Sequence, residues 1–514
     1  MATARYDVAI IGSGAGGGTL AYTLANAGKK VLLLERGGFL PREKENWDPH
    51  AVCHEARYNT KDMWHNQFGE KFNPHNHYWV GGNTKMYGAV LFRLRQQDFG
   101  EIKHHGGISP AWPMSYQDFA PWYTKAERLY SVHGERGIDP TDPPGEPYSH
   151  PPVSHEPRIQ EIVDGIKKTG LHPFPLPVGI RLDEQHPETS QCIRCNTCDG
   201  FPCLVHAKAD AHTTCVMPAL ATGNVTLRTN AKVLKLHTDA SGRQITKIEA
   251  DVNGHREEFQ ADVVTVSCGA ANSAALLQLS ANDKHPNGIG NNGSGLLGRN
   301  YMCHLNSAVV SIGKKPNPTK FQKTFGVNDF YFGGPNFQYP MGHFQMLGKM
   351  SKEMIAEGAP FFAPGMALDY IAHHSIDWWV TSEDLPNPDN HVVAGKDGGI
   401  TLHYTPNNEE GHKRLLDRLK QLTHEIGTDM VVMPKRGFLS ARIPLAGVAH
   451  QIGTCKFGTD PKSSVLDTNC KVHDVDNLYV VDGSFFCSSA AVNPALTIIA
   501  NALRVGEHLV SRMK

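Results

Sequence analysis

A glycine-rich turn between two short apolar segments, close to the N-terminus, constrains the fold of this chain more than any other feature. The β-branched run Tyr6-Asp-Val-Ala-Ile-Ile11 is typical of a buried strand, and Gly12-Ser-Gly-Ala-Gly-Gly17 follows it directly. The small, Ala-rich stretch 19–27 predicts a helix, and Val31-Leu-Leu-Leu-Glu35 predicts a second buried strand. These elements predict a βαβ unit, and therefore a parallel sheet.

The turn has the Gly-x-Gly-x-x-Gly spacing of dinucleotide-binding proteins. Glycine allows the backbone to turn tightly and to approach a pyrophosphate at the N-terminus of the next helix. Glu35 closes the second strand about 20 residues later, where a carboxylate can accept hydrogen bonds from ribose hydroxyls. The turn does not distinguish NAD from FAD. The cofactor-binding residues predicted from this unit are Gly12, Ser13, Gly14, Gly17, Glu35 and Arg36.

Composition excludes several classes of partner. The chain has 514 residues, of which 40% are hydrophobic and 20% charged, as in a soluble protein with a large core. Lys and Arg number 50 against 51 Asp and Glu, so the basic footprint of a nucleic-acid or membrane-surface protein is missing. No apolar run approaches the roughly 20 residues of a membrane span, and the first residues lack the apolar core of a secretion signal. We therefore expect a cytoplasmic protein whose cysteines are mostly thiols.

Elements of the nucleotide-binding type recur in separate blocks. Residues 225–266 predict three strands with a hairpin at Asn253-Gly254, and Leu478-Tyr-Val-Val-Asp482 predicts another strand before a helix over 494–504. Residues 305–445 predict an antiparallel sheet with intervening helices, the clearest of them over 409–426.

One interwoven domain explains these blocks. We expect an α/β fold in which a Rossmann-like cofactor-binding domain, formed by 1–100, 190–304 and 446–514, is interrupted by an α+β substrate-binding domain. The substrate domain is built on an antiparallel sheet and comprises 101–189 and 305–445.

The C-terminal block selects the cofactor. It contains His450-Gln-Ile-Gly-Thr-Cys455, Asn477-Leu-Tyr-Val-Val-Asp-Gly-Ser484 and Val492-Asn-Pro-Ala-Leu-Thr497. Together with Trp79-Val-Gly-Gly-Asn-Thr84 and Gly298-Arg-Asn300, it resembles the glucose–methanol–choline (GMC) oxidoreductases, in that family's order. The resemblance implies FAD as cofactor and oxidation of an alcohol.

The resemblance also implies which residues contact the flavin. Asp482 and Gly483 match the positions against the phosphate and ribityl chain, the backbone of Val233 matches the adenine contact, and Thr84 lines the flavin face. Met86 occupies the position of a histidine that is bonded to the flavin in some relatives, and a thioether is a poor candidate for that bond, so we predict non-covalent FAD. Further predicted cofactor contacts are Asn493 and Thr497.

His450 and Asn493 fall on the family's catalytic pair. A histidine, with its ordinary pKa near 6.5, can accept the hydroxyl proton while hydride leaves carbon for flavin N5. Asn493 does not titrate, but its amide can donate a hydrogen bond to the developing alkoxide.

The spacing Cys192-x-x-Cys195-x-x-Cys198, followed by Cys203, leaves two interpretations open. It is close to ferredoxin spacing, where thiolates hold iron–sulfur clusters, and zinc is a further possibility. The favoured interpretation is a tightly folded connector near the FAD with no metal, because similar cysteine-rich stretches occur in cluster-free relatives.

The substrate is predicted from the region 305–445 and from the resemblance. Asp369-Tyr370, His373-His374 and Asp377-Trp-Trp379 are an aromatic and polar mix suited to stacking on a sugar ring. The chain is similar to bacterial relatives of pyranose oxidase that act on free sugars or glycosides. We therefore expect oxidation of a secondary hydroxyl of such a substrate, at C3 to give a 3-keto sugar, with oxygen or another molecule as electron acceptor. The alternatives are a non-sugar alcohol such as a sterol or a choline-like compound, a cluster-bearing dehydrogenase subunit, and a flavoprotein lyase without net redox chemistry.

Overall fold

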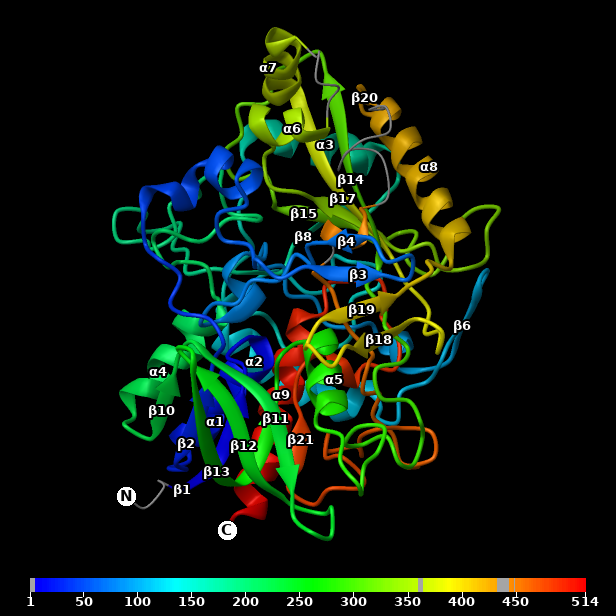
Figure 1. Ribbon diagram of the computed structural model, residues 1–514. Coiled ribbons are helices and arrows are strands. Elements are labelled where there is room, and N and C mark those ends of the chain that lie inside the picture. Colours follow the sequence, from blue (N-terminus) through cyan, green and yellow to red (C-terminus); the bar gives the residue numbers. More distant parts are fainter. Residues whose placement is uncertain (1–4, 359–363, 432–442, 448) are drawn as a thin grey trace.

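The computed structural model describes residues 5–358, 364–431, 443–447 and 449–514 (Figure 1). Its helices are α1 (Ala15–Asn26), α2 (Tyr116–Leu129), α3 (Pro157–Lys168), α4 (Met217–Ala221), α5 (Ala270–Leu279), α6 (Lys352–Gly358), α7 (Gly365–His374), α8 (Glu409–Glu425) and α9 (Ala495–Arg512).

Two sheets organise these helices. The strands of the larger sheet are β1 (Arg5–Ile11), β2 (Val31–Leu34), β10 (Val225–Arg228), β11 (Ala231–Thr238), β12 (Ile245–Val252), β13 (His255–Val266) and β21 (Leu478–Val480). Those of the second sheet are β8 (Phe174–Pro175), β14 (Leu305–Gly313), β15 (Phe325–Val327), β16 (His343–Met346), β17 (Ser375–Ser382) and β20 (Thr428–Met430). The shorter strands are β3 (Trp64–Asn66), β4 (Lys71–Phe72), β5 (Ile102–His104), β6 (Gly107–Ser109), β7 (Val132–His133), β9 (Val178–Gly179), β18 (His391–Ala394) and β19 (Ile400–His403).

The larger sheet is parallel where it carries the glycine-rich turn. Its order is β10-β2-β1-β13-β12-β11, and β21 pairs in parallel with the C-terminal part of β13. The central strands β1 and β2 are apolar runs, and Val8, Ile10 and Leu33 are fully buried, as expected for parallel strands covered on both faces. Helices α1 and α9 pack against each other beside this sheet (Figure 1).

The second sheet is antiparallel and has order β20-β14-β17-β16-β15-β8. Alternation along β17 sends neighbouring tryptophans to opposite faces. Trp378 is buried in a core with α3 and α8, whereas the partly exposed Trp379 packs against the other core. One face of this sheet is therefore ordinary core, and the other turns toward the rest of the molecule.

The predicted α/β class, the βαβ unit, the hairpin at Asn253-Gly254 and the antiparallel sheet are confirmed. Two predicted helix bounds are wrong. Helix α1 begins at Ala15 and not at Thr19, because its glycines form the first turn and pack against strand ends, and α9 continues to Arg512. The proposed domain boundaries stay a prediction.

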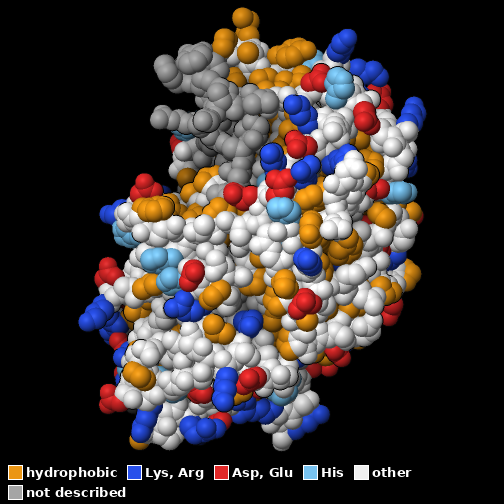
Figure 2. All heavy atoms as spheres, turned by 90° about the vertical axis from the view of Figure 1, so that its right-hand side faces the viewer, with side chains coloured by type: hydrophobic (Ala, Val, Ile, Leu, Met, Phe, Trp, Pro, Cys, Tyr) orange, Lys and Arg blue, Asp and Glu red, His pale blue; other side chains and the backbone are white. Residues whose placement is uncertain are grey.

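The surface agrees with the charge balance. On the face in Figure 2, acidic and basic side chains alternate among polar and apolar ones without a basic stripe. Within the described ranges, no helix is both long enough and apolar enough to cross a membrane.

Candidate functional site

The glycine-rich turn ends at an uncapped helix. Gly14 is the N-cap residue of α1, and no side chain caps this end, so its N–H groups are available to an anion. A Cβ on Gly14 would have only the Cα of Gly82 nearby, at 3.9 Å. A Cβ on Gly17 would lie 1.9 Å from the carbonyl oxygen of Gly12, and one on Gly12 would lie 2.3 Å from that of Ser267. Gly14 thus borders open space, whereas Gly12 and Gly17 are required by packing.

Glu35 lies beside this turn. One carboxylate oxygen accepts hydrogen bonds from the backbone N–H and the hydroxyl of Ser13, at 3.0 and 2.6 Å, and the other accepts from the N–H of Gly37 at 2.9 Å. Burial raises the pKa of Glu35, while these hydrogen bonds act in the opposite direction. Arg36 pairs with Asp62 at 2.9 Å, and its charge also lowers the pKa of the adjacent Glu35.

Asp482 accepts hydrogen bonds at the start of a second helix, α5, that has no capping side chain. Its Oδ2 accepts from the N–H of Gly269 at 2.9 Å and from the hydroxyl of Ser273 at 2.5 Å. Gly269 is the N-cap residue of α5, and a Cβ there would meet nothing within 4 Å. A Cβ on Gly483 would instead lie 2.8 Å from the carbonyl oxygen of Gln451, the neighbour of His450.

The other predicted cofactor contacts are distributed around these helix starts. The hydroxyl of Thr84 donates to the Gly81 carbonyl at 2.5 Å, beside the turn, and Val233 lies on β11 at a register shift. Met86 is buried in an apolar cluster, and the hydroxyl of Thr497 is bonded to that of Tyr123 at 2.8 Å. The hydroxyl of Thr497 therefore holds α9 against α2.

The backbone N–H donors and the acceptor carboxylate at this site are those that FAD requires. Helices α1, α5 and α9 all begin without a capping side chain, and α1 and α5 begin beside glycines whose Cβ positions are open. Uncapped N–H groups and positive helix dipole ends suit pyrophosphate and electron-rich ring edges. The buried carboxylate of Glu35 at the end of β2 suits ribose hydroxyls.

Long-range pairing brings the two predicted catalytic segments together. The N–H of Gly453 donates to the carbonyl of Gly483 at 3.0 Å, so the chain after His450 runs beside the chain after β21. Asn493 follows on that second segment and immediately precedes Pro494, the N-cap residue of α9. Among the described residues, the Asn493 amide makes no side-chain hydrogen bond, and it is partly exposed.

A histidine that the sequence analysis missed connects these segments. The Nδ1 of His304 lies 2.9 Å from the Nδ1 of His450, and its Nε2 lies 2.9 Å from the carbonyl oxygen of Ser489. Reciprocal backbone bonds at 3.0 Å between Met302 and Ile452 align the two histidine segments. No local pattern marks His304, because its ring partner lies 146 positions away.

Burial sets the protonation of this pair. It lowers the pKa of His304, and it lowers that of His450 well below the ordinary value, with the charges of His304 and Lys323 acting in the same direction. Both imidazoles are therefore neutral at neutral pH, and His450 can accept a proton.

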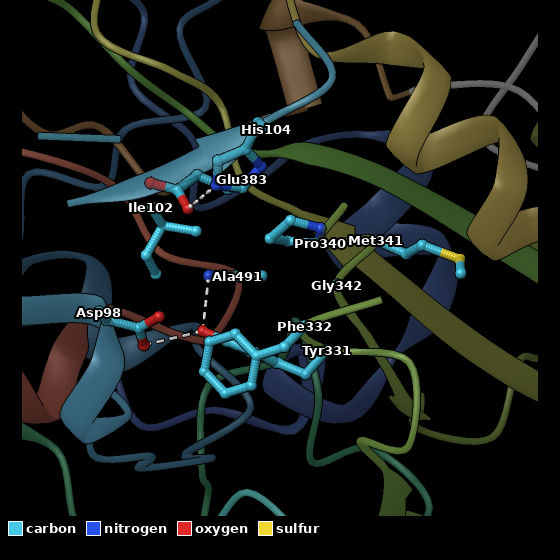
Figure 3. Close-up of a pocket in the computed structure, with 10 residues that line it drawn as sticks. All are labelled: Asp98, Ile102, His104, Tyr331, Phe332, Pro340, Met341, Gly342, Glu383 and Ala491. Carbon is cyan, nitrogen blue, oxygen red and sulfur yellow. Dashed lines mark hydrogen bonds and ion pairs between the residues drawn. The ribbon is translucent and has the colours of Figure 1, made fainter. Parts of the chain in front are cut away.

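A small pocket lies next to the segment that leads to Asn493 (Figure 3). The hydroxyl of Tyr331 donates to Asp98 at 2.9 Å and accepts from the N–H of Ala491 at 3.0 Å. Burial raises the pKa of Asp98 to about 7, with the nearby Glu383 adding to the effect. Glu383 lies beside His104 in the wall of the same pocket, with Oε2 3.0 Å from Nε2 of His104 (Figure 3).

The residues expected at the substrate wall are divided between two places. Trp379 lies on the inward face of the antiparallel sheet, and Asp377 is buried and accepts from Gln322 at 2.7 Å. The other expected residues lie on α7, at the outer end of the molecule, where Tyr370 is 52% exposed and stacks on His374 (Figure 1). The apolar side of α7, with Leu368, Ile371 and Ala372, belongs to the same core as Trp379, whereas Tyr370 and His373 lie on the exposed side of the helix.

The cysteine-rich segment forms a compact connector. The ammonium of Lys208 donates to the carbonyls of Cys198 and Phe201 at 2.6 and 2.7 Å, and Cys203 Sγ accepts two backbone N–H groups. Burial raises the pKa of Cys192 to about 11, and nearby Cys195 and Cys203 add to this. All eleven cysteines are free thiols, and in the described part of the chain no three His, Cys, Asp or Glu side chains are grouped to hold a metal ion.

Comparison with known proteins supports the same assignment. Models of the GMC oxidoreductase family match residues 44–306 and 407–502, and a Rossmann-like NAD(P)-binding model matches 10–53. The 6'''-hydroxyparomomycin C oxidase of Streptomyces lividus and the paromamine 6'-oxidase of Streptomyces fradiae are each 30% identical, over 99% of this chain and 92% of theirs. The fructose dehydrogenase large subunit of Gluconobacter japonicus is 25% identical over 100% of this chain and 99% of its own.

The fold also agrees with solved structures. Pyridoxine 4-oxidase from Mesorbium loti superimposes with a TM-score of 0.68 at 18% identity, covering 98% of this chain and 99% of that one. The Rossmann-like model covers the glycine-rich turn, and the two GMC models cover more than half of the chain, including the segment with His450 and Asn493. The chain therefore belongs to the GMC oxidoreductases, a family of FAD-binding enzymes that oxidise alcohol groups.

Proposed function

We propose that this enzyme oxidises a hydroxyl of a pyranose sugar or glycoside, at C3, to the carbonyl. The observation that carries the proposal is the neutral His450, placed by His304 against the segment that ends in Asn493. The inward-facing Trp379 supports a ring-shaped substrate, because an aromatic face stacks on the apolar face of a sugar. The paromamine and fructose enzymes among the relatives support the same substrate class.

The chain's own residues divide the work. His450 accepts the proton of the substrate hydroxyl, and the Asn493 amide donates a hydrogen bond to the oxygen as negative charge develops. Bound FAD supplies the hydride acceptor, and its electrons pass on to oxygen or another acceptor.

Cofactor binding is assigned to the uncapped helix starts. The α1 start at Gly12, Ser13, Gly14 and Gly17 would hold the pyrophosphate, and Glu35 the ribose, with Val233 near the adenine. Thr84, Asp482, Gly483 and the start of α9, with Asn493 and Thr497, would surround the flavin. Met86 offers only a thioether, so FAD should be released intact by acid precipitation.

The test is anaerobic reduction of the purified holoenzyme. We would record the flavin spectrum before and after adding D-glucose, 4-nitrophenyl β-D-glucopyranoside or paromamine. Bleaching by any of them supports the sugar assignment, and glucose deuterated at C3 or at C6 identifies the attacked carbon through the isotope effect. A flavin that no sugar reduces, but that 2-methyl-1,2-propanediol or choline reduces, would replace the sugar assignment with a non-sugar alcohol.

A further inference from the structure

The hydrogen bonds of His304 determine which of its ring nitrogens carries the proton. His304 is 2% exposed, and both of its ring nitrogens have partners: the carbonyl oxygen of Ser489 at one side and the Nδ1 of His450 at the other. A carbonyl oxygen only accepts hydrogen bonds, so the Nε2 of His304 must carry the proton. In a neutral His304, Nδ1 is then unprotonated and can only accept a hydrogen bond through its lone pair.

That lone pair determines the tautomer of the second ring. Two nitrogens 2.9 Å apart can share a hydrogen bond only if one of them carries a proton, and His304 Nδ1 does not. The proton must therefore sit on Nδ1 of His450. Its Nε2 is left unprotonated, and no described residue bonds to that nitrogen.

We propose that His304 is a positioning residue that fixes the Nδ1–H tautomer of His450, so that Nε2 is the atom that takes the substrate proton. This inference rests on the proposed role of His450 as base. Without the acceptor at His304, His450 would divide between two tautomers, and only one of them is productive.

Backbone geometry indicates that this arrangement is maintained against strain. His304 has φ of +61°, and Ala490, beside the carbonyl that orients it, has φ of +52°. Non-glycine residues in this left-handed region cost about 1–2 kcal/mol each, and such residues cluster at functional sites. The two imidazoles cross at 89° with centroids 5.1 Å apart, so the contact is a hydrogen bond and not a stack.

Two substitutions separate the two hydrogen bonds of His304. In H304N the amide oxygen can occupy the place of Nδ1 and still accept from His450, while the bond to Ser489 is lost. In H304Q the longer side chain can place its amide nitrogen where Nε2 was and still donate to Ser489, while the acceptor for His450 is lost. Asparagine also tolerates positive φ well.

The first measurement needs no substrate. In holoenzyme labelled with ¹⁵N-histidine, the His450 signals are assigned by their loss in H450N. We expect the Nδ1–H tautomer in the wild type and in H304N, and a mixture in H304Q. His450 in a single Nδ1–H tautomer in H304Q, or in the Nε2–H tautomer in the wild type, would overturn the inference.

The second measurement is anaerobic flavin reduction by D-glucose, or by 4-nitrophenyl β-D-glucopyranoside if glucose is inert. H304N should stay within a few-fold of the wild type, and H304Q should fall at least about tenfold, toward the 10²–10⁴-fold that a general base contributes. The solvent isotope effect should rise only in H304Q. The reverse order of the two variants would make His304 a structural clamp alone.

Two further results keep the test decisive. If H304Q yields no holoenzyme, H304A also removes the acceptor and should show the same mixed tautomer. If neither sugar reduces the wild-type flavin, the substrate proposal fails, while the tautomer measurement still decides the role of His304.

Discussion

The parallel and antiparallel halves of this enzyme encode their functional residues in different ways. In the parallel half, Gly14 and Glu35 belong to one continuous βαβ unit, so the local sequence places them. In the antiparallel half, Trp378 and Trp379 are adjacent residues of the same type, and only strand alternation decides which of them faces inward. A cofactor site can therefore be conserved as a motif, whereas a substrate wall can change one side chain at a time.

His450→Ala should give the largest effect, because His450 is the proposed base. We expect flavin reduction to fall by about 10²–10⁴-fold while FAD stays bound, since His450 is proposed to act on the substrate proton and not to hold the pyrophosphate. The measurement is anaerobic stopped-flow reduction with D-glucose. The control is His424→Ala, an exposed residue of α8 that pairs with Asp429 at the surface, and this variant should keep the wild-type rate. Unimpaired reduction in the His450 variant would remove it from the mechanism.

Gly14→Val should give the next largest effect, and it tests whether the parallel half binds the cofactor. The backbone of Gly14 is extended, with φ of −70° and ψ of −161°, and its Cβ position is open, so valine fits without strain but occupies the expected pyrophosphate site. We expect a folded protein with at least about 100-fold weaker FAD binding, given that each 1.4 kcal/mol is tenfold, measured by titration of the apoprotein.

Two other glycines give the matched comparison for this variant. Gly16→Ala should fail to fold, because its Cβ would lie 1.9 Å from the carbonyl oxygen of Val481. Gly165→Ala, within α3, should be neutral or stabilising, because its nearest contact is 3.4 Å and alanine favours helix. Normal FAD affinity in the Gly14 variant would show that the pyrophosphate lies elsewhere.

Much of this site could be predicted from sequence, and the exceptions share a cause. The βαβ unit, the sheets, the main helices and the segments around His450 and Asn493 have local signals of apolar period, turn residues and motif. His304 has none, because its role comes from pairing of the 302 and 452 segments. The expected wall at 369–374 was inferred from composition, which cannot tell an exposed helix such as α7 from an inward strand.

Substitution of the two tryptophans sharpens the comparison of the halves. Trp378→Ala removes a fully buried side chain whose Nε1 donates to Ser311, so we expect a loss of about 3–5 kcal/mol of stability. Trp379→Ala should destabilise less but raise KM for a sugar several-fold, with kcat less affected. Thermal unfolding and steady-state kinetics on both variants check this. Equal KM effects in the two variants would contradict the division of faces.

Asp98→Asn is expected to change the pH dependence of stability and not the chemistry, and it concerns the boundary between the halves. The folded pKa of Asp98 is raised from 3.8 to about 7, so its protonated form is favoured in the folded state. The contribution to stability is complete below about pH 4 and is lost as the pH rises through about 7, by up to about 4 kcal/mol.

Asparagine retains an acceptor for Tyr331 and for the backbone N–H of Arg95 but does not ionise. The variant should therefore lose less stability than the wild type between pH 5 and 8, measured as the shift in Tm. Asp283→Asn, at an exposed position, should keep the wild-type slope. If the Asp98 variant also kept that slope, the carboxyl would be ionised in the folded protein, and the hydrogen bond from Tyr331 that steadies the Ala491–Asn493 segment would be charge-assisted at neutral pH.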